Sequence, residues 1–207
     1  ILESYDVPRT HVHVIHNAVD LDEFSPGAAW AQREEARAGW GIPDDRLCLL
    51  VVGHNYRLKG LWRVLELLPE IERAVGPVHL LVVGRGTGWS QRTRARLTSR
   101  LRGFAGKVTL TGSVYPPLAA YGAADALLHL SWHDSFGFTV LESMACGLPV
   151  VASKFAGASE LIETGASGYV VDPENDRAVL DALGELGIAD VRERVGEAAT
   201  RVAAEQD

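Results

Sequence analysis

Short apolar runs alternate with longer stretches of helical periodicity along nearly the whole chain, and this alternation restricts the possible folds more than any other feature. The clearest run, Leu47–Val52, reads Leu-Cys-Leu-Leu-Val-Val. A strand covered on both faces reads as a continuous hydrophobic run of this kind, whereas a half-exposed strand alternates apolar and polar residues. Alternating buried strands and helices predict an α/β fold with a doubly wound parallel sheet and right-handed crossovers.

The pattern gives each expected strand and helix a place in the chain. The expected strands cover residues 12–16, 47–52, 78–83, 108–111, 126–130, 150–152 and 169–171. The expected helices cover residues 29–39, 59–75, 89–104, 115–124, 138–146, 157–164, 174–187 and 189–206. Ligands of such sheets bind at the carboxyl ends of the strands. Because Gly53, Gly84, Gly112 and Asp134 each follow an expected strand, we expect one composite site at this edge.

The composition is that of an acidic globular protein, with 20 Lys and Arg against 27 Asp and Glu and a formal net charge of −7. This balance argues against general nucleic-acid binding. Cys48 and Cys146 lie in apolar contexts, so we interpret them as buried thiols rather than as disulfide, metal-binding or nucleophilic residues. No apolar run approaches the roughly 18 residues of a membrane span and no signal peptide is visible, so a reducing, cytoplasmic location is the default expectation.

Two carboxylates, Asp134 and Glu142, bracket a turn that opens a helix, which then stops at Gly147 before a Val-rich strand. A helix N-terminus offers unpaired backbone N–H groups and a partial positive charge, so it is a natural seat for phosphate. A carboxylate inside that helix is well placed to accept hydrogen bonds from sugar hydroxyls. A phosphate beside a hydroxyl-rich ring describes a nucleotide-sugar.

The same residues also suggest two other kinds of site, a glycoside hydrolase centre and a metal site. The pair Asp134 and Glu142 also suggests a glycoside hydrolase, but one carboxylate precedes the helix and the other lies inside it, which favours binding. His129 and His133 suggest a metal site with Asp134, yet residues four apart on a strand are roughly 13 Å apart, too far to share one ion at about 2 Å. We therefore interpret His129 as a packed strand residue and expect no metal.

The loop from Gly53 to Gly60 follows a buried strand and enters a helix. Arg57 and Lys59 place cationic donors beside this loop, where a diphosphate can be gripped by a point charge or by a bidentate guanidinium. The alternative is a pair of solvated side chains at a helix start. Cations are unfavourable at a helix N-terminus unless an anion joins them, and this favours a functional role.

The segment that begins at Gly84 invites a dinucleotide-binding interpretation, but Trp89 stands where the third glycine of that motif belongs, and residues 85–107 contain no acid to bind a ribose. We interpret the glycines as a tight turn beside the site. The same segment is rich in arginine, from Arg85 to Lys107. A solvated helix face is favoured, and peripheral docking at the inner membrane face remains the alternative.

Several motifs occur in an order that resembles the donor-binding C-terminal domain of retaining GT-B glycosyltransferases of family 4 (glycosyl transferases group 1). Segment 16–24 resembles that family's interdomain connector, segment 53–60 its lysine-glycine loop, and segment 134–142 its Glu-x7-Glu motif. Residues 145–152, Ala-Cys-Gly-Leu-Pro-Val-Val-Ala, match the family nearly verbatim. Segments 156–160 and 165–169 match those that follow. The resemblance runs from about residue 13 to residue 173.

The resemblance implies a Rossmann-like, C-terminal half of a GT-B fold. Residues 1–20 would be the tail of an N-terminal domain and the connector, 21–190 the donor-binding domain and 191–207 a C-terminal helix. The chain starts at Ile1 and ends in a helical pattern, so we expect a fragment, inactive alone, whose acceptor-binding N-terminal domain is absent. The intact protein would transfer a sugar from a nucleoside-diphosphate-sugar to an acceptor hydroxyl with retention, in polysaccharide or lipopolysaccharide synthesis, without a metal or other cofactor.

Residue roles follow from the same resemblance. Lys59, Asp134 and Glu142 would be catalytic: Lys59 would contact the diphosphate, Asp134 the transferred sugar and Glu142 the ribose. Backbone amides of the first helical turn would approach the sugar and the distal phosphate, and Val114 would hold the base through its backbone. The implied donor site comprises Gly53, His54, Arg57, Lys59, Gly84, Val114, Asp134, Phe136, Gly137, Phe138, Thr139 and Glu142.

The chain departs from the family pattern at three positions. His54 replaces the loop arginine, with Arg57 nearby as a substitute, Asp134 is one methylene shorter than the usual glutamate, and Ala18 replaces a connector glycine. The shorter carboxylate implies a different sugar preference. Three alternatives stay open: a non-catalytic nucleotide-sugar-binding module, a GT-B nucleotide-sugar epimerase and, disfavoured by Trp89, a nicotinamide-dependent oxidoreductase.

Overall fold

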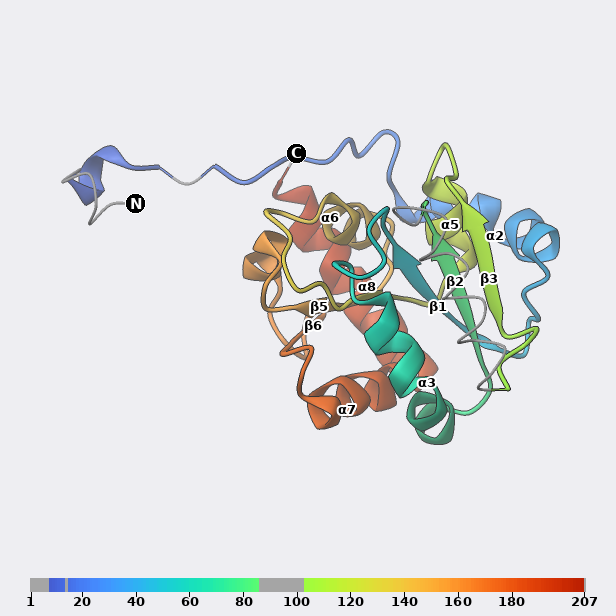
Figure 1. Cartoon of the computed structure of the whole chain (residues 1–207). Helices are drawn as coiled ribbons and strands as arrows, with labels where there is room; N and C mark the ends of the chain where they lie inside the picture. Colours follow the sequence, from blue (N-terminus) through green and yellow to red (C-terminus); the bar gives the residue numbers. More distant parts are fainter. Residues whose placement is uncertain (1–7, 14, 86–102, 207) are drawn as a thin grey trace.

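The computed structural model describes residues 8–13, 15–85 and 103–206. Residues 89–102 of the expected helix 89–104, and with them most of the arginine-rich segment, lie outside the described residues. Within the described part, helices cover both faces of a single twisted sheet, and the segment before residue 19 extends away from this body (Figure 1).

Six parallel strands form the sheet in the order β3-β2-β1-β4-β5-β6. Their bounds are β1 Leu47–Val52, β2 Val78–Val83, β3 Val108–Gly112, β4 Ala126–His129, β5 Val150–Ser153 and β6 Tyr169–Val171. This is the strand order of a doubly wound nucleotide-binding sheet, whose ligand crevice opens where the order reverses, here between β1 and β4. The predicted α/β fold is confirmed.

The expected strand 12–16 is wrong. Its described residues are not in a strand, and the apolar side chains of Val12 and Ile15 are 39% and 90% exposed. The segment has the alternation of a strand, but among the described residues no neighbouring strand pairs with it. A strand is stabilised by a partner ladder, which a local pattern cannot supply.

Helices follow the expected places with shifted ends. Their bounds are α2 Pro26–Trp40, α3 Leu61–Val75, α5 Leu118–Ala123, α6 Phe138–Ala145, α7 Asp176–Leu186 and α8 Ala189–Ala204, with 3-10 turns η1 Arg9–His11 and η2 Gly157–Leu161. The expected α-helix 157–164 is the 3-10 turn η2 instead. The amide of Ala158 bonds to the carbonyl of Phe136 at 2.7 Å, so the start of this segment is tied to the loop after β4 rather than free to extend as a helix.

A hydrophobic core fills each face of the sheet, because successive strand residues point to opposite sides. Leu50 and Leu127 pack with α2, α5 and α6 on one face, and Leu49 and Leu128 pack with α3 and α7 on the other. Helix α8 contributes to both clusters (Figure 1). Both layers therefore hold the strand ends, and the loops that follow them, in fixed relative positions.

The two cysteines are free and buried, as predicted. Burial raises the pKa of the Cys48 thiol to about 12, and the charge of Asp125 adds to this effect. Burial also raises the pKa of Cys146 to about 12. Since a thiolate is the reactive form, both thiols are unreactive at neutral pH. No helix in the described part of the chain is both long and apolar enough to cross a membrane.

Candidate functional site

The loop after β1 is pressed onto the loop after β4. The amide of Trp132 donates to the carbonyl of Leu58 at 2.9 Å. Gly60 has a φ of 73°, and a side-chain carbon added there would overlap the backbone carbonyl of Leu130. A carbon added at Gly53 would overlap the side-chain stem of Lys59. These close approaches fix the path of Lys59 toward the end of β4.

Lys59 and Asp134 form a hydrogen-bonded ion pair across the two loops. Their side chains are 23% and 13% exposed, so the pair is partly shielded from solvent. Burial by itself would raise the pKa of Asp134, but hydrogen bonds from His129 and Lys59 outweigh it and hold this pKa well below its ordinary value. Asp134 is therefore ionised at neutral pH and acts only as a hydrogen-bond acceptor.

Helix α6 begins directly after this carboxylate. Its N-cap is Gly137, with a φ of 95° and no side chain to accept a hydrogen bond, and its first turn contains no acidic residue. The amides of Gly137, Phe138 and Thr139 therefore form an N-terminus without a side-chain cap, the arrangement that binds phosphate. Lys59 brings a cation to the same turn through its contact with Asp134. The positive N-terminal end of α6 and the ammonium of Lys59 thus both lie beside the carboxylate of Asp134.

The aromatic residues at this turn have different environments. The side chain of Phe136 is buried in the core, while that of Phe138 is 53% exposed. Their rings pack edge to face, with centroids 5.3 Å apart and an interplanar angle of 68°. The predicted involvement of Phe136 is thus limited to its backbone, and only Phe138 presents a side chain to solvent.

Glu142 lies in the same helix, about 6 Å along the axis from Phe138 at 1.5 Å per residue. Its carboxylate accepts a hydrogen bond from the hydroxyl of Tyr121 on α5. Burial raises the pKa of Glu142; the Tyr121 bond lowers it and the charge of Glu23 raises it again. Burial also raises the pKa of Tyr121, as do the charge and the hydrogen bond of Glu142. The two carboxylates of this segment thus have pKa values shifted in opposite directions, that of Asp134 downward and that of Glu142 upward.

The remaining predicted residues join the loops after β1, β2 and β3. His54 Nδ1 accepts a hydrogen bond from the amide of Arg85 at 3.2 Å. Gly84 accepts a bond from the hydroxyl of Tyr56 at 2.7 Å and donates its amide to Gly112 at 2.6 Å. Val114 is half-buried against the core on the α5 side. These contacts bring the predicted loops to one edge of the sheet.

Arg57 does not join the Lys59 cluster. Its side chain is exposed and lines a separate hollow of about 490 Å³ with Asn55, Leu58 and Trp132. His54 is also exposed, and its ring contacts the Arg85 amide rather than Lys59. The structure therefore assembles Lys59, Asp134 and the α6 N-terminus, with Arg57 and His54 at the margin.

Two contacts of the site were missed from sequence. His129 is buried, as the interpretation of a packed strand residue requires, but its Nε2 also lies 3.0 Å from Oδ2 of Asp134. Tyr121, which binds Glu142, has no signature beyond its place in an amphipathic segment. His133 is exposed, and within the described ranges no group of three potential ligands could hold a metal ion.

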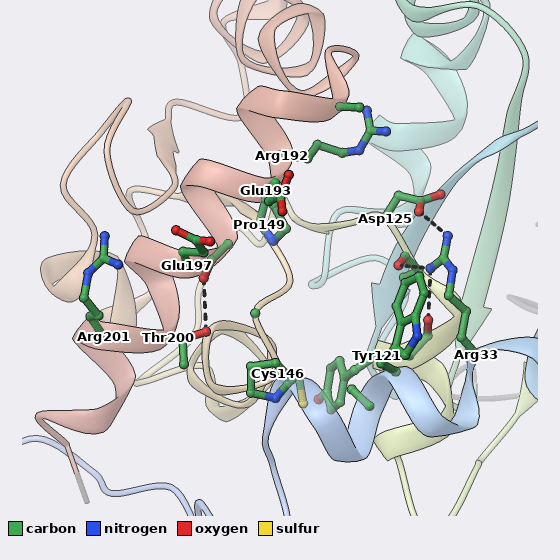
Figure 2. A pocket seen from close by; sticks show the side chains of 18 residues that line it. Arg33, Tyr121, Asp125, Cys146, Pro149, Arg192, Glu193, Glu197, Thr200 and Arg201 are labelled. Atoms are coloured by element: carbon green, nitrogen blue, oxygen red, sulfur yellow. Dashed lines mark hydrogen bonds and ion pairs between the residues drawn. The ribbon is translucent and has the colours of Figure 1, made fainter.

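A cavity of about 820 Å³ lies elsewhere, between α2, α5 and α8. It is beside Asp125 and Pro149, which directly precede β4 and β5 (Figure 2). Arg33 spans part of it and bonds to Asp125 at 2.6 Å. It is thus at the amino edge of the sheet, opposite the predicted site, and none of the predicted donor residues line it.

Comparison with known proteins assigns the fold. The family model described as "Glycosyl transferases group 1" matches residues 32–202. The D-inositol 3-phosphate glycosyltransferase of Corynebacterium jeikeium (strain K411) is 32% identical over 211 residues, covering 99% of this chain and 50% of the relative. The enzyme of the same name from Mycolicibacterium smegmatis is 32% identical over 195 residues, covering 90% and 42%. The chain thus spans about half the length of the curated relatives it matches.

Solved structures agree on the architecture. The glycosyltransferase from Rickettsia africae ESF-5 superimposes with a TM-score of 0.87 at 22% identity, over 99% of this chain and 55% of that one. Anabaena Alr3699/HepE, crystallised with UDP-glucose, gives a TM-score of 0.79 at 22% identity, over 94% and 53%. The described sheet and helices correspond to about half of each of these longer chains.

Proposed function

Because this chain belongs to the glycosyl transferases group 1 family, we propose that it is the donor-binding half of a retaining, family 4 glycosyltransferase that moves a sugar from a nucleoside-diphosphate-sugar to an acceptor hydroxyl. The observation that carries this proposal is the meeting of Lys59, Asp134 and the uncapped N-terminus of α6 at the carboxyl edge of the sheet. The structurally similar Anabaena Alr3699/HepE was crystallised in complex with UDP and with UDP-glucose, which supports a donor of this chemical class.

In the proposed reaction the diphosphate lies at the α6 N-terminus. The amides of Gly137, Phe138 and Thr139 and the ammonium of Lys59 stabilise the charge that develops on the leaving diphosphate. Asp134, held ionised, accepts a hydrogen bond from a hydroxyl of the transferred sugar. Glu142 accepts from the ribose. With Lys59 and helix amides in these roles, we expect the reaction to proceed without a metal ion.

The acceptor part of the proposal draws on the relatives. They are named for a D-inositol 3-phosphate acceptor, which supports a hydroxyl of a cyclitol or sugar as the group that is glycosylated. We propose that acceptor binding belongs to the part of the relatives' length that this chain does not span.

Substitution of the two charged residues tests the site. In the intact protein, Lys59→Ala and Glu142→Ala should each weaken donor binding or turnover at least tenfold, about 1.4 kcal/mol, measured as kcat/KM for the donor. Lys107→Ala is a matched control, because Lys107 forms a comparable ion pair with Glu72 at 2.6 Å and lies at the start of β3, at the other edge of the sheet. Unchanged donor kinetics in both site variants would refute the assignment.

A non-catalytic donor-binding module is the second candidate, favoured by the length of the chain relative to its curated relatives. We expect the 207 residues alone to bind a nucleotide-sugar without transferring or hydrolysing it. Calorimetry with UDP-, GDP- and ADP-sugars measures the binding, and release of free sugar reports hydrolysis. Turnover by these residues alone would contradict this expectation, and conversion of the donor into its epimer would instead favour the epimerase alternative.

A further inference from the structure

His129 links the carboxylate before α6 to the first turn of that helix. It is the last residue of β4 and is 1% exposed. Its Nε2 lies 3.0 Å from Oδ2 of Asp134, and its Nδ1 lies 3.4 Å from the hydroxyl oxygen of Thr139. A rigid strand thus carries an imidazole that contacts both sides of the turn 135–138.

The neighbouring groups define which ring nitrogen faces which partner. Asp134 is ionised and can only accept, so Nε2 of His129, which faces it at 3.0 Å, must carry a hydrogen. The Thr139 hydroxyl faces Nδ1 at 3.4 Å and can either donate to it or accept from it. The resulting chain runs from the Thr139 hydroxyl through His129 to Oδ2 of Asp134.

This chain orients one carboxylate. Lys59 donates a hydrogen bond to Oδ2 of Asp134, and Nε2 of His129 lies 3.0 Å from the same oxygen, so neither contact uses Oδ1. A sugar hydroxyl that donates to Asp134 therefore has Oδ1 available in a fixed plane. Lys59 has a flexible stem and is assigned above to the diphosphate, whereas the buried ring of His129 has no other role in the proposed reaction. His129 is the contact that persists when Lys59 binds phosphate.

We propose that His129 is a positioning residue that fixes Asp134 for recognition of the transferred sugar, with Thr139 holding the orientation of its ring. This rests on the proposed function, since it requires the donor sugar to lie at Asp134. The consequence is specific: loss of His129 should remove affinity for the sugar portion of the donor while leaving affinity for the free nucleoside diphosphate largely intact.

Calorimetry on the intact protein tests this with UDP, GDP and ADP and with UDP-glucose, GDP-mannose and ADP-glucose. Each free diphosphate is paired with its matching nucleotide-sugar, and the pair that binds most tightly is used. His129→Leu should weaken binding of that nucleotide-sugar about tenfold or more, the loss expected for one hydrogen bond to a charged group. Affinity for the matching free diphosphate should stay within about twofold, because its phosphate contacts are unchanged.

Two further variants separate positioning from packing. His129→Gln should restore most of the sugar affinity, because the glutamine amide nitrogen can donate where Nε2 does. Thr139→Val removes the hydroxyl that contacts Nδ1 while keeping the volume. It should weaken binding of the nucleotide-sugar more than binding of the free diphosphate, and it tests the inference even if His129→Leu fails to fold.

His79 supplies the matched control. It is equally buried on β2, which is separated from β4 by β1, and its Nε2 also contacts a threonine hydroxyl, that of Thr109 at 2.9 Å. His79→Leu should leave the ratio of sugar to diphosphate affinity unchanged. If the ratio of nucleotide-sugar affinity to free-diphosphate affinity is also unchanged in the folded His129 and Thr139 variants, this inference is overturned while the proposed function stands. Wild-type protein that binds none of the six nucleotides would overturn the proposed function and the inference with it.

Discussion

Asp134 and Glu142 belong to one short motif, yet their environments shift their pKa values in opposite directions. Donors from Lys59 and His129 stabilise the charged form of Asp134, whereas burial disfavours that of Glu142. Asp134 therefore adds stability that is present above its ordinary pKa and is lost as the pH falls through its lowered value. Glu142 instead reduces stability as the pH rises through its ordinary pKa, because the folded state binds its proton more tightly than the unfolded state does.

Glu142→Gln is expected to raise the free energy of unfolding at neutral pH. A raised pKa means that the ionised Glu142 costs stability as the pH rises above its ordinary value of 4.5, and the amide removes this charge while keeping an acceptor for Tyr121. Urea unfolding at about pH 8 should show the gain, and at about pH 3 the two proteins should unfold alike.

The same variant should lose donor affinity, so stability and function would change in opposite directions. Glu185→Gln is the control, since Glu185 also accepts a hydrogen bond from a tyrosine, Tyr169, at 2.7 Å. A Glu142→Gln protein that is less stable at neutral pH would mean that the charged hydrogen bond from Tyr121 outweighs the cost of burial.

At the scale of elements, the loop between β1 and α3 depends on a glycine that no other residue can replace without strain. Gly60→Ala should destabilise the protein by more than about 2 kcal/mol, because the new carbon adds an unfavourable left-handed conformation and overlaps the carbonyl of Leu130. Urea unfolding measures the loss.

Gly41→Ala isolates the conformational part of this cost. Gly41 also has a positive φ, of 64°, but an added carbon meets nothing within 4 Å, so its substitution should cost about 1 kcal/mol. Equal losses at the two positions would show that the contact between the β1 loop and the end of β4 is not tight.

The strands were the most predictable elements. Leu47–Val52 and Val78–Val83 match their expected bounds because a parallel strand covered on both faces is almost continuously apolar, with His79 as the one polar residue of the two runs. The α5 segment begins only at Leu118, after Pro116 and Pro117, since proline restricts the residue before it and cannot donate to a helix. The failed strand 12–16 shows the limit of a local pattern, which does not reveal whether a partner strand exists.

The site was predictable only where its residues share one segment or follow strand ends. The spacing of Asp134 and the α6 N-terminus can be read along the chain, and the parallel sheet brings Lys59 to the same edge. The contacts of His129 with Asp134 and of Tyr121 with Glu142 depend on side-chain directions across packed elements. A buried histidine or tyrosine in a core pattern carries no sign of such a contact.

At the scale of the whole molecule, the sheet separates two surfaces. The predicted donor residues gather at the carboxyl edge, beside the switch point between β1 and β4, while the cavity of about 820 Å³ lies among α2, α5 and α8 at the amino edge (Figure 2). Of these two surfaces, the first brings together an uncapped helix N-terminus, a lysine and an ionised carboxylate. The proposed function therefore requires the nucleotide to bind at the carboxyl edge rather than in that cavity.

A crystal structure of the protein with a bound nucleoside-diphosphate-sugar tests this requirement most directly. We expect the diphosphate to lie against the amides of Gly137, Phe138 and Thr139, with Lys59 in contact with its oxygens. Asp134 should contact the transferred sugar and Glu142 the ribose. A diphosphate bound between α2 and α8, beside Arg33 and Arg192, with the α6 N-terminus unoccupied, would contradict it.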